Sequence, residues 1–352
     1  MKALIAMSGG VDSSVSALLT AAQGYDCIGC TMLLHDSADS GAEDARLAAE
    51  RLKMPHHVLD LRAEFREEVI GSFVQCYLCG KTPNPCIECN RRFKFSRLLA
   101  FAESLGCDRI VTGHYARIVQ SGGGFQLLRG TDAGKDQSYV LYMLTQAQLS
   151  HILLPLGGLT KQEVRRIAGE NGFVNAQKQD SQDICFVPDG DYAGKVEQFS
   201  GKKAVPGDFV DAAGNVLGQH QGIIRYTVGQ RRGLGIALGA PAYVTAIDAA
   251  NNRVVIGTND DLFSDCAELS GMNWISGDPP AEPVRCTAKI RYRHPAQPAV
   301  LRFTGADTAI LRFDAPQRAV TAGQAGVCYD GETVLGGGCI ERAFHSAKVA
   351  CV

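Results

Sequence analysis

A glycine-rich turn between a strand and a helix constrains this chain most. Residues 8–14 read Ser-Gly-Gly-Val-Asp-Ser-Ser; they follow the apolar run 3–7 and precede a helix-like stretch that begins near Val11. Gly9 and Gly10 leave no side chain in the way and can adopt backbone angles that other residues avoid, so several N–H groups can converge on an anion. The positive end of the helix dipole adds to this attraction. The pattern predicts a phosphate-binding turn.

The turn contains no lysine. The kinase-type loop GxxxxGK[ST] needs its lysine to reach the transferred phosphate, so this turn is better suited to hold the pyrophosphate of ATP during adenylation. Ser8, Ser13 and Ser14 supply hydroxyl donors, and Asp12 is placed to orient the loop or to hold a magnesium ion that bridges phosphates. The alternative is an ordinary glycine turn that ends a strand.

Strand-like and helix-like segments alternate over the first two hundred residues. Strands are expected at 4–7, 27–33, 57–59 and 109–112, and helices at 11–22, 42–52, 65–77 and 95–105. Thr160 is expected to cap a further helix that stops at Gly172. Such alternation predicts an α/β fold with a parallel sheet that is covered on both faces and binds ligands beyond the carboxyl ends of its strands.

The sequence pattern changes near Gly201. Beyond it, short β-like runs are separated by Gly, Asn-Asn and Asp-Gly turns. These runs are 242–247, 254–256, 299–303, 309–313 and 327–329. They predict two small β-rich domains joined by a linker within 270–282. The expected domains are 1–200, 201–272 and 273–352.

Composition restricts the compartment and the partners. No apolar run approaches a membrane span, and the 13 cysteines are an odd number, so we expect a cytoplasmic protein with reduced thiols and no membrane partner. The net charge is only −2, so a nucleic acid would need local basic clusters. Such clusters occur at Arg91, Arg92, Lys94 and Arg97, at Arg231 and Arg232, and at 291–294.

Two CxxC pairs, Cys76–Cys79 and Cys86–Cys89, are separated by six residues. Four thiolates at this spacing would make a cramped zinc knuckle. The second pair precedes a basic helix expected to begin near Arg91, and a thiol ahead of such a helix is favoured as thiolate. Cys185 lies far downstream among polar residues.

Seven segments in order resemble the bacterial tRNA-specific 2-thiouridylase family across essentially the whole chain. They are 8–14, 82–90 followed by Lys94-Phe95, 112–115, 135–139, 180–186, 226–235 and 290–293. The resemblance implies an ATP pyrophosphatase-loop domain of the adenine nucleotide alpha hydrolase-like class, with a helical tRNA-contacting segment. Two small β-rich domains would follow, the last of them a β-barrel.

The resemblance also implies the reaction, which is the ATP-dependent 2-thiolation of the wobble uridine of tRNA anticodons. Oxide is a very poor leaving group, so ATP would adenylate the C2 oxygen before sulfur attacks, releasing pyrophosphate and then AMP. Cys185 would carry a persulfide. Cys89 would be the nucleophile that either releases hydrosulfide from it or forms a closing disulfide with Cys185, which must then be reduced. Both roles call for a low thiol pKa.

The resemblance assigns further residues and partners. The implied ATP contacts are Ala6, Met7, Ser8, Gly9, Gly10, Val11, Asp12, Ser13, Met32 and Gly113. The implied RNA contacts are Asn84, Pro85, Cys86, Lys135, Asp136, Gln137, Arg291 and Tyr292. The expected partners are the anticodon stem-loop of tRNA and a sulfur donor such as a cysteine desulfurase or a sulfur-relay protein.

Cys86 opens a second mechanism, because many members of the family have Asp at its position. Cys86, Cys89 and Cys185 could hold a four-iron four-sulfur cluster whose free iron binds hydrosulfide. Two other functions also stay open. A small-molecule synthetase with the same loop would leave the cysteine motifs without a role. An RNA-binding protein with a zinc knuckle would leave 8–14 unexplained.

Overall fold

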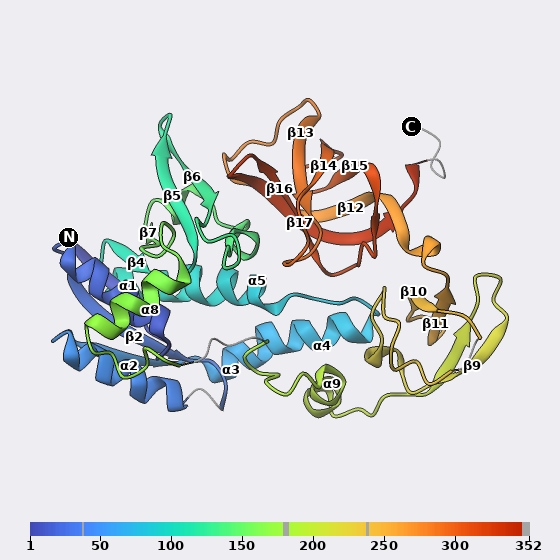
Figure 1. The fold of residues 1–352 in the computed structure, drawn as a ribbon, viewed down its shortest axis with the longest axis horizontal. Helices are drawn as coiled ribbons and strands as arrows, with labels where there is room; N and C mark the ends of the chain where they lie inside the picture. The colour runs from blue at the N-terminus through green and yellow to red at the C-terminus, as the bar shows by residue number, and fades with distance from the viewer. Residues whose placement is uncertain (37–38, 179–182, 237–238, 347–352) are drawn as a thin grey trace.

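The computed structural model describes residues 1–36, 39–178, 183–236 and 239–346. An α/β part holds the N-terminus, a small sheet lies at the opposite end of the molecule, and a barrel lies above the long helices that run between them (Figure 1). The sequence prediction of an α/β domain followed by two β-rich parts, the last a barrel, is confirmed. Among the described residues, no helix is long and apolar enough to cross a membrane.

The α/β part is built on five parallel strands in the order β3-β2-β1-β4-β7. They are β1 (Lys2–Ala6), β2 (Asp26–Leu33), β3 (His56–Asp60), β4 (Arg109–Val111) and β7 (Ile152–Leu153). Apolar side chains of α1 (Val11–Ala22), α2 (Asp39–Arg51) and α8 (Lys161–Glu170) pack in one core, and those of α6 (Leu98–Ser104) in the other. Both faces of the sheet are therefore covered, as predicted.

Two long helical segments extend from this sheet beneath the barrel (Figure 1). The first joins α3 (Arg62–Phe65), a π-helical stretch (Arg66–Ile70) and α4 (Gly71–Leu78). The second joins α5 (Pro85–Cys89), a π-helical stretch (Asn90–Arg97) and α6. This second helix starts at Pro85 and not near Arg91, because proline fits the first turn and the Asn84 side chain accepts a hydrogen bond from the Cys86 N–H at 3.1 Å.

Shorter elements complete this part. They are the hairpin strands β5 (Ala116–Ser121) and β6 (Gly124–Arg129), the 3₁₀ turn η4 (Ser138–Leu141), α7 (Gln146–Leu149) and α9 (Tyr192–Ser200). The expected cap and stop of α8 are present: Thr160 caps it, and Gly172 follows its end with φ +63°. Strand β6 pairs with β17 of the barrel through Leu128 and Thr333, so the hairpin ties the two parts together.

The small sheet has the order β10-β11-β8-β9. Its strands are β8 (Gly207–Val210), β9 (Val216–His220), β10 (Tyr243–Asp248) and β11 (Arg253–Gly257), with the 3₁₀ turns η5 (Ile223–Arg225) and η6 (Asp260–Leu262) beside them. Phe209, Tyr226 and Val244 form its compact core.

The barrel closes because β12 pairs with both β15 and β17. Its strands are β12 (Phe263–Trp274), β13 (Val284–Lys289), β14 (Gln297–Phe303), β15 (Ala309–Arg318), β16 (Ala325–Asp330) and β17 (Thr333–Phe344). The stretch 270–282, expected to link two domains, contains the end of β12, and Pro279-Pro280 lies in the turn between β12 and β13. The barrel strands thus begin at Phe263, before the expected boundary at 273.

Candidate active site

The glycine-rich turn lies beyond the carboxyl end of β1. Gly9 has φ +73°, and a Cβ atom there would lie 2.2 Å from the carbonyl oxygen of Gly41, so only glycine fits. Gly10 has φ −87° and ψ 160°, an extended conformation open to any residue. Gly9 thus uses the conformational freedom expected of the two glycines, whereas Gly10 contributes the lack of a side chain beside the helix end.

Backbone groups at this turn are available for an anion. Helix α1 begins after Gly10, and no side chain caps its N-terminus. The Ser13 hydroxyl accepts from the Ser8 N–H at 3.2 Å and donates to the Gly10 carbonyl at 2.9 Å, and the Ser14 hydroxyl donates to the same carbonyl at 3.2 Å. Ser13 and Ser14 thus hold the turn in shape, while Ser8 is exposed at its rim.

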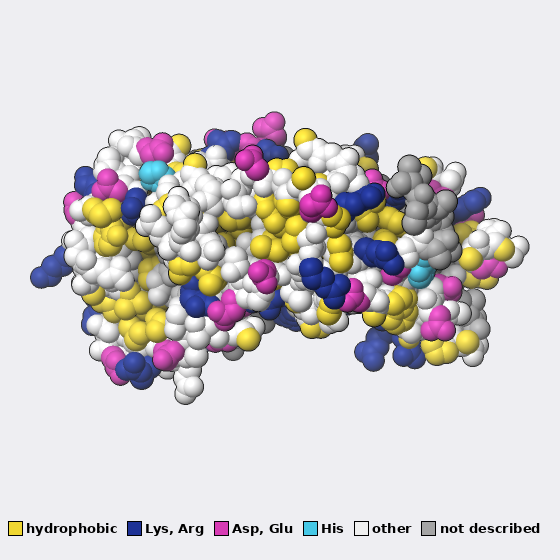
Figure 2. Space-filling view, turned by 90° about the horizontal axis from the view of Figure 1, so that it is seen from above, with side chains coloured by type: hydrophobic (Ala, Val, Ile, Leu, Met, Phe, Trp, Pro, Cys, Tyr) yellow, Lys and Arg dark blue, Asp and Glu magenta, His cyan; other side chains and the backbone are white. Residues whose placement is uncertain are grey.

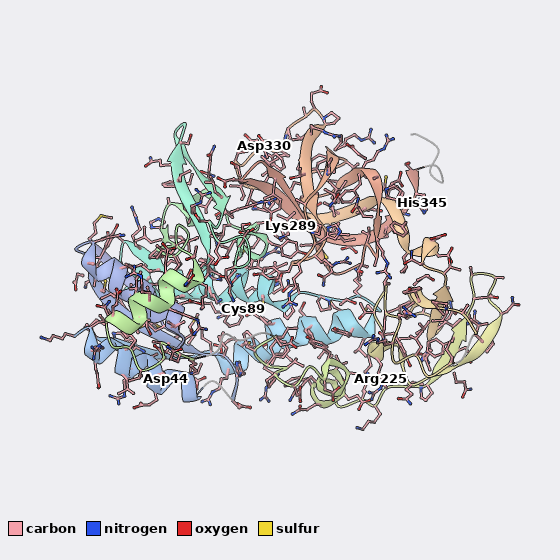
Figure 3. The ribbon with its side chains drawn as sticks, in the orientation of Figure 1. Asp44, Cys89, Arg225, Lys289, Asp330 and His345 are labelled. Atoms are coloured by element: carbon pink, nitrogen blue, oxygen red, sulfur yellow. The ribbon has the colours of Figure 1, made fainter. Side chains whose placement is uncertain are left out.

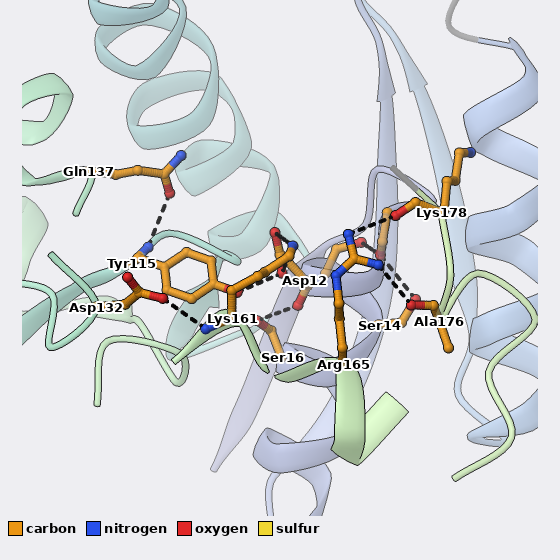
Figure 4. Close-up of polar contacts among 12 residues, drawn as sticks. Asp12, Ser14, Ser16, Tyr115, Asp132, Gln137, Lys161, Arg165, Ala176 and Lys178 are labelled. Carbon is orange, nitrogen blue, oxygen red and sulfur yellow. Dashed lines mark hydrogen bonds and ion pairs between the residues drawn. The ribbon is translucent and has the colours of Figure 1, made fainter. Parts of the chain in front are cut away.

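Asp12 is fixed by two residues that sequence reasoning did not find (Figure 4). Its carboxylate accepts two hydrogen bonds from the Lys161 Nζ atom, at 2.7 and 2.9 Å, and one from the Tyr115 hydroxyl at 2.8 Å. Lys161 is 9% exposed and occupies the first position of α8. A lysine there opposes the helix dipole, which is the one sequence cue that could have marked it.

Residues at the carboxyl ends of the neighbouring strands β4 and β2 lie in the predicted ATP site with the turn. A Cβ atom on Gly113, just after β4, would lie 3.1 Å from Asp12 and 3.2 Å from the Ser13 nitrogen, so glycine permits close packing against α1. Met32, at the end of β2, is half-buried between the sheet core and the core near the cysteines. The Asn175 amide donates at 3.0 Å to the Gly9 carbonyl and to the Ser14 hydroxyl, a contact that the sequence did not predict.

The acidic side chain of the turn does not fit a magnesium site by itself. Mg²⁺ takes oxygen ligands in octahedral geometry, and both Asp12 oxygens already accept hydrogen bonds from the Lys161 ammonium. Of the two predicted roles for Asp12, the contacts favour orientation of the loop. A magnesium ion at this turn would therefore rely on phosphate oxygens and water.

The three candidate cysteines come together from distant segments. Cys86 and Cys89 lie on α5, and Cys185 is close enough to both for their charges to raise its pKa. Phe186 anchors the Cys185 segment, because its ring contacts Phe65 and Phe73 with centroid distances of 5.9 and 5.2 Å. Residues 180–182 of the same motif lie outside the described residues.

Burial of the sulfur atoms raises the pKa of all three thiols, although Cys86 and Cys185 are exposed as whole residues. The pKa of Cys89 rises to about 11 and that of Cys185 to about 12, with burial as the largest cause, and the pKa of Cys86 also rises. Lys94 opposes the rise at each thiol without overcoming it. The low thiol pKa that the assigned roles call for therefore differs from the direction of these shifts, because burial outweighs the favourable charge of Lys94.

Lys94 links the cysteines to the turn. Its ammonium lies 3.5 Å from the His114 Nε2 atom, whose ring places Nδ1 2.8 Å from the Thr112 hydroxyl. Burial, with Lys94 as a second cause, holds the pKa of His114 well below its ordinary value, so the ring is neutral. Residues 112–115 thus contact the turn through Gly113 and Tyr115 and the cysteine side through His114.

The cysteines do not form a preassembled metal site. Across residues 1–36, 39–178, 183–236 and 239–346, no three His, Cys, Asp or Glu side chains are grouped closely enough to hold a metal ion. This holds for the trio Cys86, Cys89 and Cys185 and for the zinc knuckle with Cys76 and Cys79.

The predicted RNA contacts lie in both the α/β part and the barrel. Asn84 and Pro85 begin the cysteine helix, whereas Arg291 and Tyr292 follow β13 on the barrel. The Asp136 carboxylate is buried and accepts hydrogen bonds from the Gly130 N–H, the Ser138 N–H and the Ser138 hydroxyl, so it shapes its own loop. Gln137 accepts from the Tyr115 N–H at 3.1 Å, and Lys135 is half-buried.

Most of the basic cluster at 91–97 is neutralised within the protein. Arg91 and Arg92 pair with Glu88, and Arg92 and Arg97 pair with Glu68. Lys94 is the member of the cluster that points toward the cysteines, as its effect on their pKa values indicates. Arg231 and Arg232 lie near a glycine-lined recess of about 500 Å³ in the part that carries β10.

Comparison with known proteins identifies the family. Residues 1–189 match a family model described as a tRNA methyl transferase HUP domain, 196–258 a PRC-barrel domain and 264–340 an aminomethyltransferase beta-barrel domain. The tRNA-specific 2-thiouridylase MnmA of Lachnoclostridium phytofermentans is 48% identical over 353 residues, covering 96% of this chain and 99% of that protein. The protein of the same name from Acidithiobacillus ferrooxidans is 48% identical over 345 residues, covering 97% and 98%.

Solved structures resemble part of the chain. The U34-tRNA thiolase NcsA from Methanococcus maripaludis with its [4Fe-4S] cluster has a TM-score of 0.35 and 16% identity, covering 56% of this chain and 66% of that one. NMN synthetase from Francisella tularensis has a TM-score of 0.35 and 18% identity, covering 58% and 79%. The full-length relatives, in contrast, leave no ambiguity: the chain belongs to the tRNA-specific 2-thiouridylase family and is a tRNA sulfurtransferase.

Proposed function

We propose that the protein replaces the C2 oxygen of the wobble uridine of tRNA anticodons by sulfur, using ATP and a persulfide on Cys185. The observation that carries this proposal is the meeting of Cys185 with Cys89 and Cys86 beside a segment, 112–115, that also contacts the anion-binding turn. A small-molecule synthetase would have no use for these cysteines.

The reaction begins at the turn. The C2 oxygen of uridine attacks the α-phosphate of ATP, which forms an adenylated oxygen and expels pyrophosphate toward Gly9, Gly10 and the start of α1. Lys161, held at Asp12, adds positive charge at this place. Magnesium, when bound with the nucleotide, neutralises part of the phosphate charge.

Sulfur transfer can then take place by two sequences of steps, which differ in when the persulfide bond breaks. In one, the Cys89 sulfur attacks the Cys185 sulfur, breaks the persulfide bond and releases hydrosulfide, which displaces AMP from C2. In the other, the terminal persulfide sulfur displaces AMP first, and Cys89 then breaks the sulfur–sulfur bond. Both orders end in thiouridine, AMP and a Cys89–Cys185 disulfide, which a two-electron reductant must open before a sulfur donor reloads Cys185.

Cysteine variants test the proposal. Cys89→Ser and Cys185→Ser should each abolish thiouridine formation on unmodified tRNA, measured by mass spectrometry of digested nucleosides, because a hydroxyl cannot carry or attack the persulfide. Cys79→Ser, on an exposed thiol outside the site, is the matched control and should remain active. Substantial thiolation by either serine variant of the site would contradict the assigned roles. Iron found in anaerobically purified active protein would favour the cluster route instead.

A further inference from the structure

Two basic side chains lie near each other between the hairpin and the barrel. Arg129 ends strand β6, and Lys289 ends strand β13. Both are half-buried. Burial lowers the pKa of Lys289; the charge of Asp136 opposes this shift, and the charge of Arg129 adds to it. Two like charges are therefore held together where water is partly excluded.

Among the described residues, neither cation has an ionic partner. Within the described ranges, Arg129 and Lys289 make no ion pair and no side-chain hydrogen bond, and the Arg129 Nε atom is buried without a partner. Their contacts are aromatic: the Arg129 guanidinium lies 4.1 Å from the Tyr329 ring centre, and the Lys289 ammonium lies 5.8 Å from those of Tyr139 and Tyr292. Such contacts compensate only part of the cost of burying a charge.

One acid, Asp136, acts on Lys289 without an ion pair between the two in the described part of the chain. Its charge favours the Lys289 ammonium, but its carboxylate accepts three hydrogen bonds in its own loop. Two other half-buried cations of the same region are paired, Arg117 with Glu332 at 2.8 Å and Lys81 with Glu341 at 2.5 Å, whereas Arg291 donates to the Ala319 carbonyl at 3.3 Å. Half-burying two like charges without an ion pair costs free energy, so this arrangement fits a ligand that brings negative charge.

The pair adjoins the cysteine helix. Tyr292, which flanks Lys289, is near enough to Cys86 for the charge of that thiol to contribute to raising the pKa of Tyr292, after burial and Asp136. In Figure 3, Lys289 lies on the side of the barrel that faces the helix of Cys89. The outer face in Figure 2, in contrast, intersperses basic and acidic side chains around a hydrophobic middle.

We propose that Arg129 and Lys289 form a pocket that binds a backbone phosphate of the tRNA next to the nucleotide presented to Cys86 and Cys89. The inference rests on the proposed function, since it takes the bound polyanion to be the tRNA substrate. One cation comes from the α/β part and one from the barrel, so the phosphate bridges the two parts. Tyr292 offers an adjacent ring on which an unstacked base can rest.

Neutral phosphate linkages test the pocket. An anticodon stem-loop in which one phosphate flanking the target uridine is a methylphosphonate should bind the wild-type protein at least about tenfold more weakly, because a charge-assisted contact is lost. The slope of log affinity against log salt should fall by about one. In Lys289→Met and Arg129→Met, the same replacement should have little further effect. Arg302→Met, an exposed barrel cation on β14, is the control and should respond as the wild type does.

Two results overturn the pocket. One is an equal loss of affinity in the wild type and both variants, and the other is a wild-type protein indifferent to every neutral linkage that flanks the target. The second needs no variant, so misfolding of a variant does not protect the proposal. Thiolation of full-length tRNA by the same wild-type preparation separates the two questions: its absence would defeat the proposed function, whereas normal thiolation with either result would defeat the pocket alone.

Discussion

The glycine-rich turn, residues 8–14, contains no lysine, and Lys161 of α8 supplies a positive charge beside it. Its bidentate contact with Asp12 is largely buried, so removing the ammonium leaves a carboxylate beside the phosphate site without its main cation. Lys161→Met should therefore weaken ATP binding at least about tenfold, measured by calorimetry, and leave tRNA affinity unchanged. Arg166→Met, which removes an exposed ion pair from the same helix, should have no such effect. Unchanged ATP affinity in Lys161→Met would contradict this account.

The raised thiol pKa values predict a pH dependence. Because only the thiolate reacts with iodoacetamide and the pKa of Cys89 is about 11, the thiolate fraction near neutrality is small and grows about tenfold per pH unit. Labelling of Cys89 in the free protein, followed by peptide mass spectrometry, should therefore keep accelerating from pH 7 to 10. Lys94→Met should slow it further, since Lys94 lowers the pKa of Cys89. A plateau below pH 8 would mean a thiol already ionised at rest.

Elements set by local patterns could be predicted from the sequence. The apolar runs of β1 and β2, the bounds of α1 and the Thr160 cap of α8 all follow from periodicity and capping chemistry. The start of α5 could not be placed, because Pro83 and Pro85 indicate an extended loop as readily as a first helical turn. The contacts of Asp12 with Lys161 and Tyr115 join elements distant in sequence, for which no local pattern exists.

The loop that precedes the cysteine helix is held by the barrel. The Thr82 N–H donates to the Ala322 carbonyl at 2.9 Å, and the Gln324 side chain donates to the Thr82 carbonyl at 2.7 Å. Gly323 between them has φ +90°, and a Cβ atom there would lie 2.9 Å from the Thr82 nitrogen. This close approach fixes the loop that ends in Asn84, the cap of α5.

Gly323→Val should displace that loop and lower thiolation at least about tenfold by misplacing Cys86 and Cys89, with ATP affinity retained. Gly331→Val is the matched control, because Gly331 also has a positive φ of +57° but faces open space. Both substitutions strain the backbone, and only the first meets the catalytic loop. Equal activity of the two variants, each checked for its melting temperature, would show that the barrel does not position α5.

At the scale of the whole molecule, the α/β part and the barrel meet at the hairpin, at the loop before α5 and around Tyr292. A nearly neutral protein cannot hold a polyanion through its overall charge, so the tRNA is proposed to bind where cations of both parts converge. In the proposed function, the turn and the cysteines of the α/β part and the barrel act on one substrate, which accounts for the joining of these two parts in a single chain.

The most direct test of the proposed function traces the sulfur atom from Cys185 to the tRNA. Protein carrying a ³⁴S-labelled persulfide on Cys185 is mixed with unmodified tRNA and ATP, without any other sulfur source, and the nucleosides, nucleotides and peptides are analysed by mass spectrometry. We expect labelled 2-thiouridine at the wobble position, equal amounts of AMP and pyrophosphate, and a Cys89–Cys185 disulfide after one turnover. Thiouridine without the label, or labelled thiouridine without AMP, would contradict the central claim.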